Sequence, residues 1–254
     1  MVKKPREFPM KIKLLSWWVL TALAAGLVSW TPEAFADVSS ARPDLDDRIW
    51  NATQVLNQIM LSPDQSIPEE LLAKCKAIAI YPSVLKGAFI FGARFGKGVV
   101  VTKDASGNWG PVAFSTVGGG SWGFQIGGSS TDLIVLVMND AGMESLLRNN
   151  FTLGADAQVA AGPVGRDSQA STDLFLKASL FSYSRSMGLF AGVALDGTVL
   201  TQDNNSNSAY YGRPVTSKQI LLENAATVQP TSRGLIDKLT EYSARWSARV
   251  AAKR

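Results

Sequence analysis

Apolar residues between Leu45 and Met60 recur at intervals of three and four, a spacing that predicts a long helix near the start of the chain. The stripe on one face of this helix consists of Leu45, Ala52, Val55, Leu56, Ile59 and Met60. Ser62-Pro63-Asp64 ends the pattern. Ser66 followed three residues later by Glu69 has the form of a capping box, which predicts a short second helix over 67–74.

From residue 77 the apolar period changes from 3.6 to 2, which indicates strands. The expected strands span 77–80, closed by Tyr81-Pro82, then 87–95, 97–103, 109–117, 121–126, 132–138, 151–161, 174–184 and 187–195. A helix is expected after Asp140, its predicted N-cap, and residues 204–208 are expected to form a polar turn or short helical loop. Two further helices, over 217–227 and 232–251, are expected to close the chain.

This order of elements predicts an α+β fold, with a curled or closed antiparallel sheet and flanking helices at its N-terminal and C-terminal ends. The sheet is rich in glycine, which inside strands marks bends, bulges or close approach of another backbone. The glycines concerned are Gly92, Gly96, Gly98, Gly118, Gly119, Gly120, Gly123, Gly127 and Gly128. With no tandem repeat and no low-complexity linker, we expect a single domain over 37–254, with a core at 71–212 and C-terminal helices within 217–251.

The first 36 residues have the order of a secretory signal peptide: a basic leader, the uncharged apolar stretch from Leu14 to Trp30, and Ala34-Phe35-Ala36 as a cleavage signal. The alternative is an uncleaved membrane anchor, for which the apolar stretch is short. The sequence therefore predicts export, with the mature protein in the periplasm or cell envelope. Residues 37–254 carry 20 basic and 19 acidic residues, a net charge of +1, which gives no support for binding nucleic acid.

The chain has no histidine and a single cysteine, Cys75. A disulfide within the chain, zinc sites of the Cys/His type, and Ser-His-Asp or Cys-His catalysis are therefore excluded. A mechanism that uses only carboxylates stays open, with Asp132, Asp140, Glu144 and Asp156 near expected strand ends. Their spacing matches no catalytic pattern, so we expect no enzyme activity, no metal and no cofactor.

Gly118-Gly119-Gly120-Ser121-Trp122-Gly123 fits the dinucleotide pattern GxGxxG in form only. A dinucleotide site needs a helix to begin there, whereas Phe124-Gln125-Ile126 alternates as a strand does. Nucleotide binding is not expected.

A long series of motifs runs from Lys76 to Gly212 and resembles the SYLF domain family. Its parts include Ala77-Ile78-Ala79-Ile80-Tyr81-Pro82, Gly92-Ala93-Arg94-Phe95-Gly96-Lys97-Gly98, Trp109-Gly110-Pro111, Gly118 to Ser121, Phe151-Thr152-Leu153-Gly154-Ala155-Asp156, Ala160-Ala161-Gly162-Pro163-Val164-Gly165-Arg166, Tyr183-Ser184-Arg185-Ser186-Met187-Gly188 and Tyr210-Tyr211-Gly212. The resemblance covers most of residues 37–254. It implies a phospholipid-binding domain, with phosphoinositides and actin filaments as partners of eukaryotic members and an exported protein among bacterial ones.

In eukaryotic members, lipid binding is linked to an amphipathic N-terminal helix and nearby bases. This chain departs from that pattern, because Arg48 is the only base on its helix, against Asp44, Asp46 and Asp47. We instead expect lipid contact at the densest run of bases, where almost no acid intervenes after Glu70. These residues are Lys74, Lys76, Lys86, Arg94 and Lys97, several of which we expect to share one rim.

The last expected helix is an alternative membrane contact. Its stripe of Leu235, Leu239, Tyr242, Trp246 and Val250 is flanked by Lys238, Arg245 and Arg249. The competing interpretation is a helix packed on the sheet, with basic side chains whose stems lie along it.

The sequence thus predicts a non-enzymatic phospholipid-binding module at the periplasmic or cell-surface side of a bacterial membrane. A structural or protein-interaction domain of the cell envelope, with an unknown protein partner, is the first alternative. A hydrolase that depends on carboxylates is the second.

Overall fold

The computed structural model describes residues 38–62, 64–89, 91–121, 129–148, 150–165, 178–186, 188–193 and 195–252. Residues Asp37–Arg254 form one compact unit. The predicted signal peptide, residues 1–36, lies outside the described residues, as do Gly123, Gly127 and Gly128 of the glycine-rich segment.

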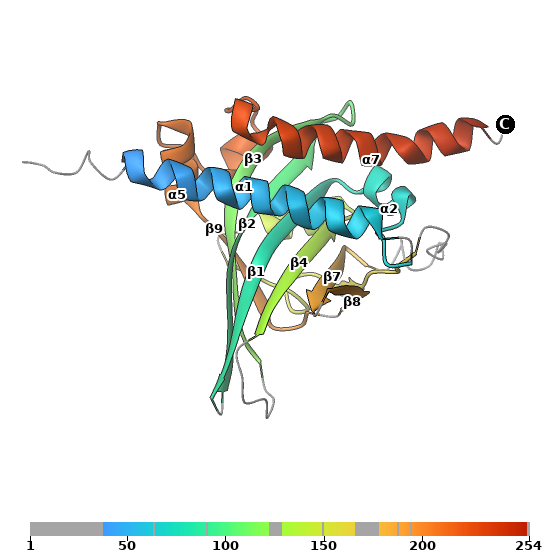
Figure 1. Ribbon diagram of the computed structural model, residues 1–254. Helices are drawn as coiled ribbons and strands as arrows, with labels where there is room; N and C mark the ends of the chain where they lie inside the picture. Colours follow the sequence, from blue (N-terminus) through green and yellow to red (C-terminus); the bar gives the residue numbers. More distant parts are fainter. Residues whose placement is uncertain are drawn as a thin grey trace, which may run out of the picture. The chain divides into compact units, whose positions relative to one another are not determined.

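A nine-stranded sheet forms the centre of this unit, in the order β5-β9-β3-β2-β1-β4-β7-β6, with β8 paired to β7 (Figure 1). The strands are β1 Ala77–Phe89, β2 Phe91–Lys103, β3 Trp109–Ser121, β4 Ser129–Val137, β5 Asn150–Thr152, β6 Val159–Ala161, β7 Leu180–Ser186, β8 Leu189–Gly192 and β9 Thr198–Gln202. Neighbouring strands are antiparallel, except that β6 runs parallel to β7. The predicted α+β class with a curled sheet and flanking helices is confirmed; the sheet is open and mixed rather than closed and purely antiparallel.

Helices cover both faces of the sheet. On one face, α1 (Val38–Leu61), α2 (Glu69–Lys74) and α7 (Arg233–Ala252) pack on Ile78 and Ile80 of β1. On the other, α3 (Asp140–Leu146) and α6 (Ser217–Leu221) pack near Ala77 and Ala79. Elsewhere in the described residues lie the helix α5 (Asn204–Tyr211) and the 3-10 turn η2 (Pro230–Ser232). Because both faces are buried, the central strands read as nearly continuous apolar runs.

Several boundaries differ from the sequence prediction. The N-cap of α3 is Asn139, which accepts from the Gly142 N–H, and not the predicted Asp140. The predicted capping box at Ser66 is wrong: α2 begins after Pro68, which takes the N-cap position, and the buried Ser66 hydroxyl has no hydrogen-bond partner among the described residues. β1 does not stop at Tyr81-Pro82 but continues through a bulge, where Ser83 adopts a positive φ of 54° and its N–H donates to Asp132.

Gly98 shows why the sheet needs glycine at particular positions. A Cβ there would lie 2.3 Å from the carbonyl oxygen of Ile80 and 2.4 Å from Cδ1 of Tyr81. The missing side chain lets the Tyr81 ring of β1 lie across β2 and reach Ser115 of β3, where the two hydroxyls are 2.7 Å apart. Glycine here therefore makes room for a neighbouring aromatic ring.

Candidate functional site

The predicted run of bases divides between the two ends of the β1–β2 hairpin. Lys74 and Lys76 lie just before β1, whose first residue, Ala77, pairs with Thr102 near the end of β2. Lys86 and Arg94 lie at the other end, where they are direct cross-strand partners. The five bases therefore do not share one rim.

We call the segment from Leu85 to Lys97, where β1 passes into β2, the hairpin end. Figure 1 shows β1, β2 and β3 extending here past the layer of α1 and α7. Leu85 and Phe95 face each other across the strands, and 61% and 56% of their surfaces are exposed. Both line a small crevice beside α1. Large apolar side chains are thus left uncovered where the helical layer ends.

The two bases at this end whose side chains are described, Lys97 and Arg94, differ in their contacts. Lys97 is half exposed, and its Nζ lies 3.8 Å from Asp44, a distance typical of a weak surface pair. Arg94 donates from Nη1 to the Thr198 hydroxyl at 3.2 Å, and its Nε is buried without a hydrogen-bond partner among the described residues. Lys86 belongs to β1, but its side chain lies outside the description.

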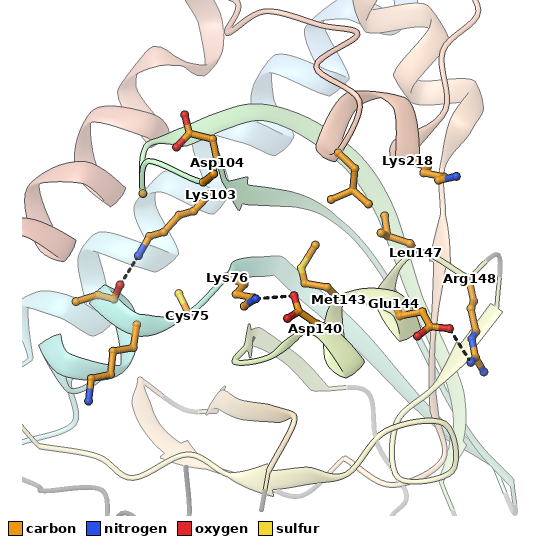
Figure 2. Close-up of a pocket in the computed structure, with 15 residues that line it drawn as sticks. Cys75, Lys76, Lys103, Asp104, Asp140, Met143, Glu144, Leu147, Arg148 and Lys218 are labelled. Atoms are coloured by element: carbon orange, nitrogen blue, oxygen red, sulfur yellow. Dashed lines mark hydrogen bonds and ion pairs between the residues drawn. The ribbon is translucent and has the colours of Figure 1, made fainter. Parts of the chain in front are cut away.

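A pocket of about 860 Å³ lies at the opposite end of the hairpin (Figure 2). Four parts of the chain build it: the segment from Ala73 to Lys76, the β2–β3 turn, α3 with the residues after it, and α6 with Leu222. Met143, Leu147 and Leu222 supply apolar walls. Its basic residues are Lys74, Lys76, Lys103, Arg148 and Lys218, and its acidic residues are Asp104, Asp140 and Glu144.

Most of the pocket's bases have acidic neighbours. Lys76 binds Asp140, and Arg148 lies 3.7 Å from Glu144, as Figure 2 shows. Lys74 binds Glu70 at 2.6 Å, and Lys218 lies 3.5 Å from Glu223. These are exposed pairs of low energy, so the pocket carries a nearly balanced set of charges rather than a strongly positive surface.

Lys103 has a structural role at the edge of this pocket. Its Nζ donates to the carbonyl oxygens of Leu72 and Ala73 at 2.8 and 2.7 Å, which lie at the C-terminal end of α2. It also lies 4.6 Å from the centre of the Trp109 ring. Burial lowers the pKa of Lys103. This lysine therefore fixes α2 to the sheet.

The alternative membrane contact on α7 is largely used for packing. Leu235, Leu239 and Tyr242 are buried against α1 and α2. Arg249 forms an ion pair with Glu69 at 3.2 Å, and Trp246 is partly buried. Arg245 pairs with Glu241 at 2.7 Å and lies 4.4 Å from the centre of the Tyr242 ring. The inner part of the stripe and Arg249 thus attach the helix to α1 and α2, whereas Arg245 pairs within α7 itself.

The carboxylates considered for catalysis have structural partners. Asp132 binds Arg185 at 3.3 Å and accepts from the Ser83 N–H, and Asp156 accepts from the Thr152 N–H at 2.7 Å. Asp140 and Glu144 hold the pocket's ion pairs. Among the residues that the structure describes, no cluster could hold a metal ion, and no helix is long and apolar enough to span a bilayer.

Sequence reasoning missed both the exposed Leu85–Phe95 pair and the pocket. The pocket gave no local signal, because Lys76, Arg148 and Lys218 come from distant parts of the chain. The exposed pair could not be foreseen because of the bulge in β1. Tyr81 and Val84 face the same core cluster although they are three residues apart, whereas regular alternation would put residues an even number apart on one face. Alternation counted from Tyr81 therefore assigns Leu85 to the wrong face of the sheet.

Comparison with known proteins adds independent information. Residues 118–242 match the family model Ysc84, described as "Las17-binding protein actin regulator". The human SH3 domain-containing YSC84-like protein 1 is 33% identical over 197 residues, covering 76% of this chain and 57% of its own length. LAS seventeen-binding protein 3 of Saccharomyces cerevisiae is 33% identical over 193 residues, covering 73% of this chain and 41% of its own.

A third relative, the SH3 domain-containing protein PJ696.02 of Schizosaccharomyces pombe, is 34% identical over 185 residues, covering 70% of this chain and 43% of its own length. The chain thus spans about half the length of the curated relatives it matches. These relatives are eukaryotic, and their family is described by actin regulation. The prediction of a bacterial protein exported to the periplasm or cell envelope is therefore contradicted.

Proposed function

The chain belongs to the SYLF (Ysc84) family, and on that premise we propose that it is a non-enzymatic binding module for anionic phospholipid. One observation carries the proposal. The hairpin end combines the exposed Leu85–Phe95 pair with Lys86, Arg94 and Lys97, in a stretch of sequence that contains no acidic residue, although Asp44 and Asp47 of α1 line the same crevice.

The charge pattern supports an anionic partner. Between Leu71 and Lys103 the sequence contains six bases and no Asp or Glu. A base near an anionic membrane contributes about 1 kcal/mol, and this attraction is screened within about 8 Å at physiological ionic strength. Three bases acting together at the hairpin end would change affinity by roughly a hundredfold. Their position beside exposed apolar side chains favours a lipid surface over a purely polar ligand.

The proposal is tested by co-sedimentation of residues 37–254 with two kinds of vesicle. One is pure phosphatidylcholine, and the other also contains phosphatidylserine; each is used at two salt concentrations. Binding to the anionic vesicles that weakens in high salt supports the proposal. Equal binding to both kinds of vesicle, or no binding to either, contradicts it.

Attachment to a protein partner at the pocket of Figure 2 is a second candidate function. It is favoured by the family's description and by a cavity of about 860 Å³ whose apolar walls of Met143, Leu147 and Leu222 lie among charged side chains. The names of two of these relatives include an SH3 domain, and this chain spans only about half the length of each, so a partner of the whole relative is proposed here only for the shared part.

A pull-down with purified Las17 tests this second function. Met143→Asp together with Leu222→Asp would place acidic side chains on the pocket wall. Retention by the unaltered module and loss in the variant would support the pocket, provided that the variant melts as the parent does. Absence of retention by the unaltered module would remove this candidate.

A further inference from the structure

We infer that the hairpin end penetrates the lipid interface as an apolar wedge, with Lys86 and Arg94 marking the depth at which it stops. The inference rests on the proposed function and deepens it. Adsorption by charge requires bases alone, whereas penetration also requires an uncharged apolar segment beyond them. The hairpin supplies both in the required order.

The base pair and the segment beyond it are defined by the strand register. Lys86 is paired with Arg94, Gly87 with Ala93, Ala88 with Gly92, and Phe89 with Phe91. None of the seven residues between Lys86 and Arg94 in the sequence has a polar side chain. Three residues in each strand, at a rise of about 3.3 Å, extend about 10 Å past the bases. Interfacial elements bury their apolar faces by about 5–10 Å, so this length fits the boundary between head groups and acyl chains.

The backbone of the hairpin end is suited to an environment with little water. Unpaired N–H and C=O groups are costly in hydrocarbon. Here β1 and β2 pair with each other up to Phe89 and Phe91, and β3 pairs with β2 as far as Gly92. On the other side, β4 pairs with β1 from Lys86 inward. Beyond Lys86 and Arg94, the hairpin of β1 and β2 is therefore still paired with β3. At these two bases, the four strands β4, β1, β2 and β3 are hydrogen-bonded side by side.

Leu85 and Phe95 lie one residue to the body side of Lys86 and Arg94. Their exposure would be unfavourable in water but suits contact with the head-group region, where apolar side chains and bases lie together. Lys97 is on the same face and is also half exposed. These side chains extend the apolar and basic character of the hairpin end toward the body of the domain.

This arrangement also predicts an orientation. The pocket of Figure 2 adjoins Lys76 and Lys103, at the end of β1 and β2 that is remote from Phe89 and Phe91. A module that enters the membrane with its hairpin end turns this pocket away from the bilayer. The pocket then stays accessible to a partner in solution.

The chain offers a direct way to measure depth. Its one cysteine, Cys75, is buried, so a thiol-reactive dye would label an introduced cysteine selectively. Ala93→Cys places an NBD label on an exposed residue beyond the bases, and Ser106→Cys places one on the exposed β2–β3 turn at the pocket end. Each labelled protein is mixed with vesicles of phosphatidylcholine and phosphatidylserine, with or without nitroxide-labelled acyl chains.

We expect NBD emission at position 93 to shift to shorter wavelength and to be quenched by the nitroxide, with no change at position 106. In high salt, Leu85→Ser with Phe95→Ser should weaken vesicle binding about tenfold while leaving the melting temperature unchanged, because both side chains are exposed.

Vesicle binding with no change at position 93, or with the response at position 106 instead, overturns the wedge but leaves phospholipid binding intact. If the unlabelled module does not sediment with anionic vesicles, the proposed function fails as well. If the NBD emission at position 93 shifts in the absence of vesicles, and the shift grows with protein concentration, the hairpin end is a contact between two copies of the chain. That result would also overturn the wedge.

Discussion

The hydroxyl groups of Tyr81 and Ser115 lie 2.7 Å apart across an intervening strand. Both residues are buried, and the Tyr81 ring reaches Ser115 by lying over Gly98 of β2. The contact therefore joins β1 to β3 directly and stabilises the part of the sheet from which the hairpin end extends.

Loss of this hydrogen bond should be measurable as a coupling between the two residues. Tyr81→Phe leaves the Ser115 hydroxyl buried without its partner, and we expect a cost of about 1–2 kcal/mol in the free energy of unfolding. Ser115→Ala in the Tyr81→Phe background should cost much less than it does alone. Urea denaturation of the four proteins in a double-mutant cycle measures the coupling; additive effects would show that the contact contributes no stability.

Gly98 should tolerate substitution poorly. Gly98→Ala introduces a Cβ within 2.4 Å of both the Ile80 carbonyl oxygen and the Tyr81 ring, so the strands or the ring must move. We expect a loss of about 1–3 kcal/mol, the usual cost of overpacking. Gly110→Ala in β3 is the matched control, since the nearest atom to its Cβ would be the Thr102 carbonyl oxygen at 3.4 Å. Equal melting temperatures for the two variants would contradict the close-approach account of Gly98.

Arg48 of α1 forms an ion pair with Asp203, with Nη1 3.2 Å from Oδ2, and this pair should make stability depend on pH. Burial alone would raise the pKa of the Asp203 carboxyl, but hydrogen bonds from Ser206 and Arg48 outweigh burial and hold it below its ordinary value of 3.8. Because the pKa is lower in the folded state, ionised Asp203 stabilises the fold above the unfolded value, and this contribution is lost as the pH falls through the folded value.

We therefore expect Asp203→Asn to cost about 1–2 kcal/mol at neutral pH, and the difference from the parent to shrink once the pH falls below 3.8. The measurement is the free energy of unfolding of both proteins between neutral and acidic pH. Asp47→Asn, at an exposed position of α1, serves as the control and should change little. A difference that stays constant across this range would show that Asp203 is not stabilised in its ionised form.

Cys75 should be unreactive in the folded protein. Burial raises the pKa of its thiol to about 12, and the thiol donates to the Leu72 carbonyl oxygen at 3.2 Å. Iodoacetamide at pH 8 should modify Cys75 only after denaturation, as followed by mass spectrometry. Modification of the folded protein at the rate of a free thiol would mean that this region opens readily.

Sequence patterns predicted the elements whose stabilising contacts recur at a regular spacing. The stripe from Leu45 to Met60 identified α1, although the helix begins earlier, at Val38. β9 was missed, because Thr198–Gln202 is short and follows a turn at Gly197. For α7, the same apolar stripe fits a membrane surface or a protein surface, and only the distant partners α1 and α2 decide between them.

The candidate site was predictable only in part, for a related reason. A run of bases without acids is visible in the sequence, but its division depends on β1 and β2 being antiparallel, which places Lys76 and Lys86 at opposite ends of the hairpin. Exposure of Leu85 depends on the bulge at Ser83, a position where a non-glycine residue with positive φ is hard to foresee.

The central claim, that the hairpin end is the contact for anionic phospholipid, is tested most directly by comparing two triple variants of equal charge loss. Lys86→Ala, Arg94→Ala and Lys97→Ala remove the bases of the hairpin end, and Lys74→Ala, Lys76→Ala and Lys218→Ala remove bases from the pocket. Affinity for vesicles containing phosphatidylserine is measured by co-sedimentation at physiological salt, for proteins that share the parent's melting temperature. We predict a loss of roughly a hundredfold for the hairpin variant and little change for the pocket variant. Equal losses, or a larger loss in the pocket variant, would contradict the account.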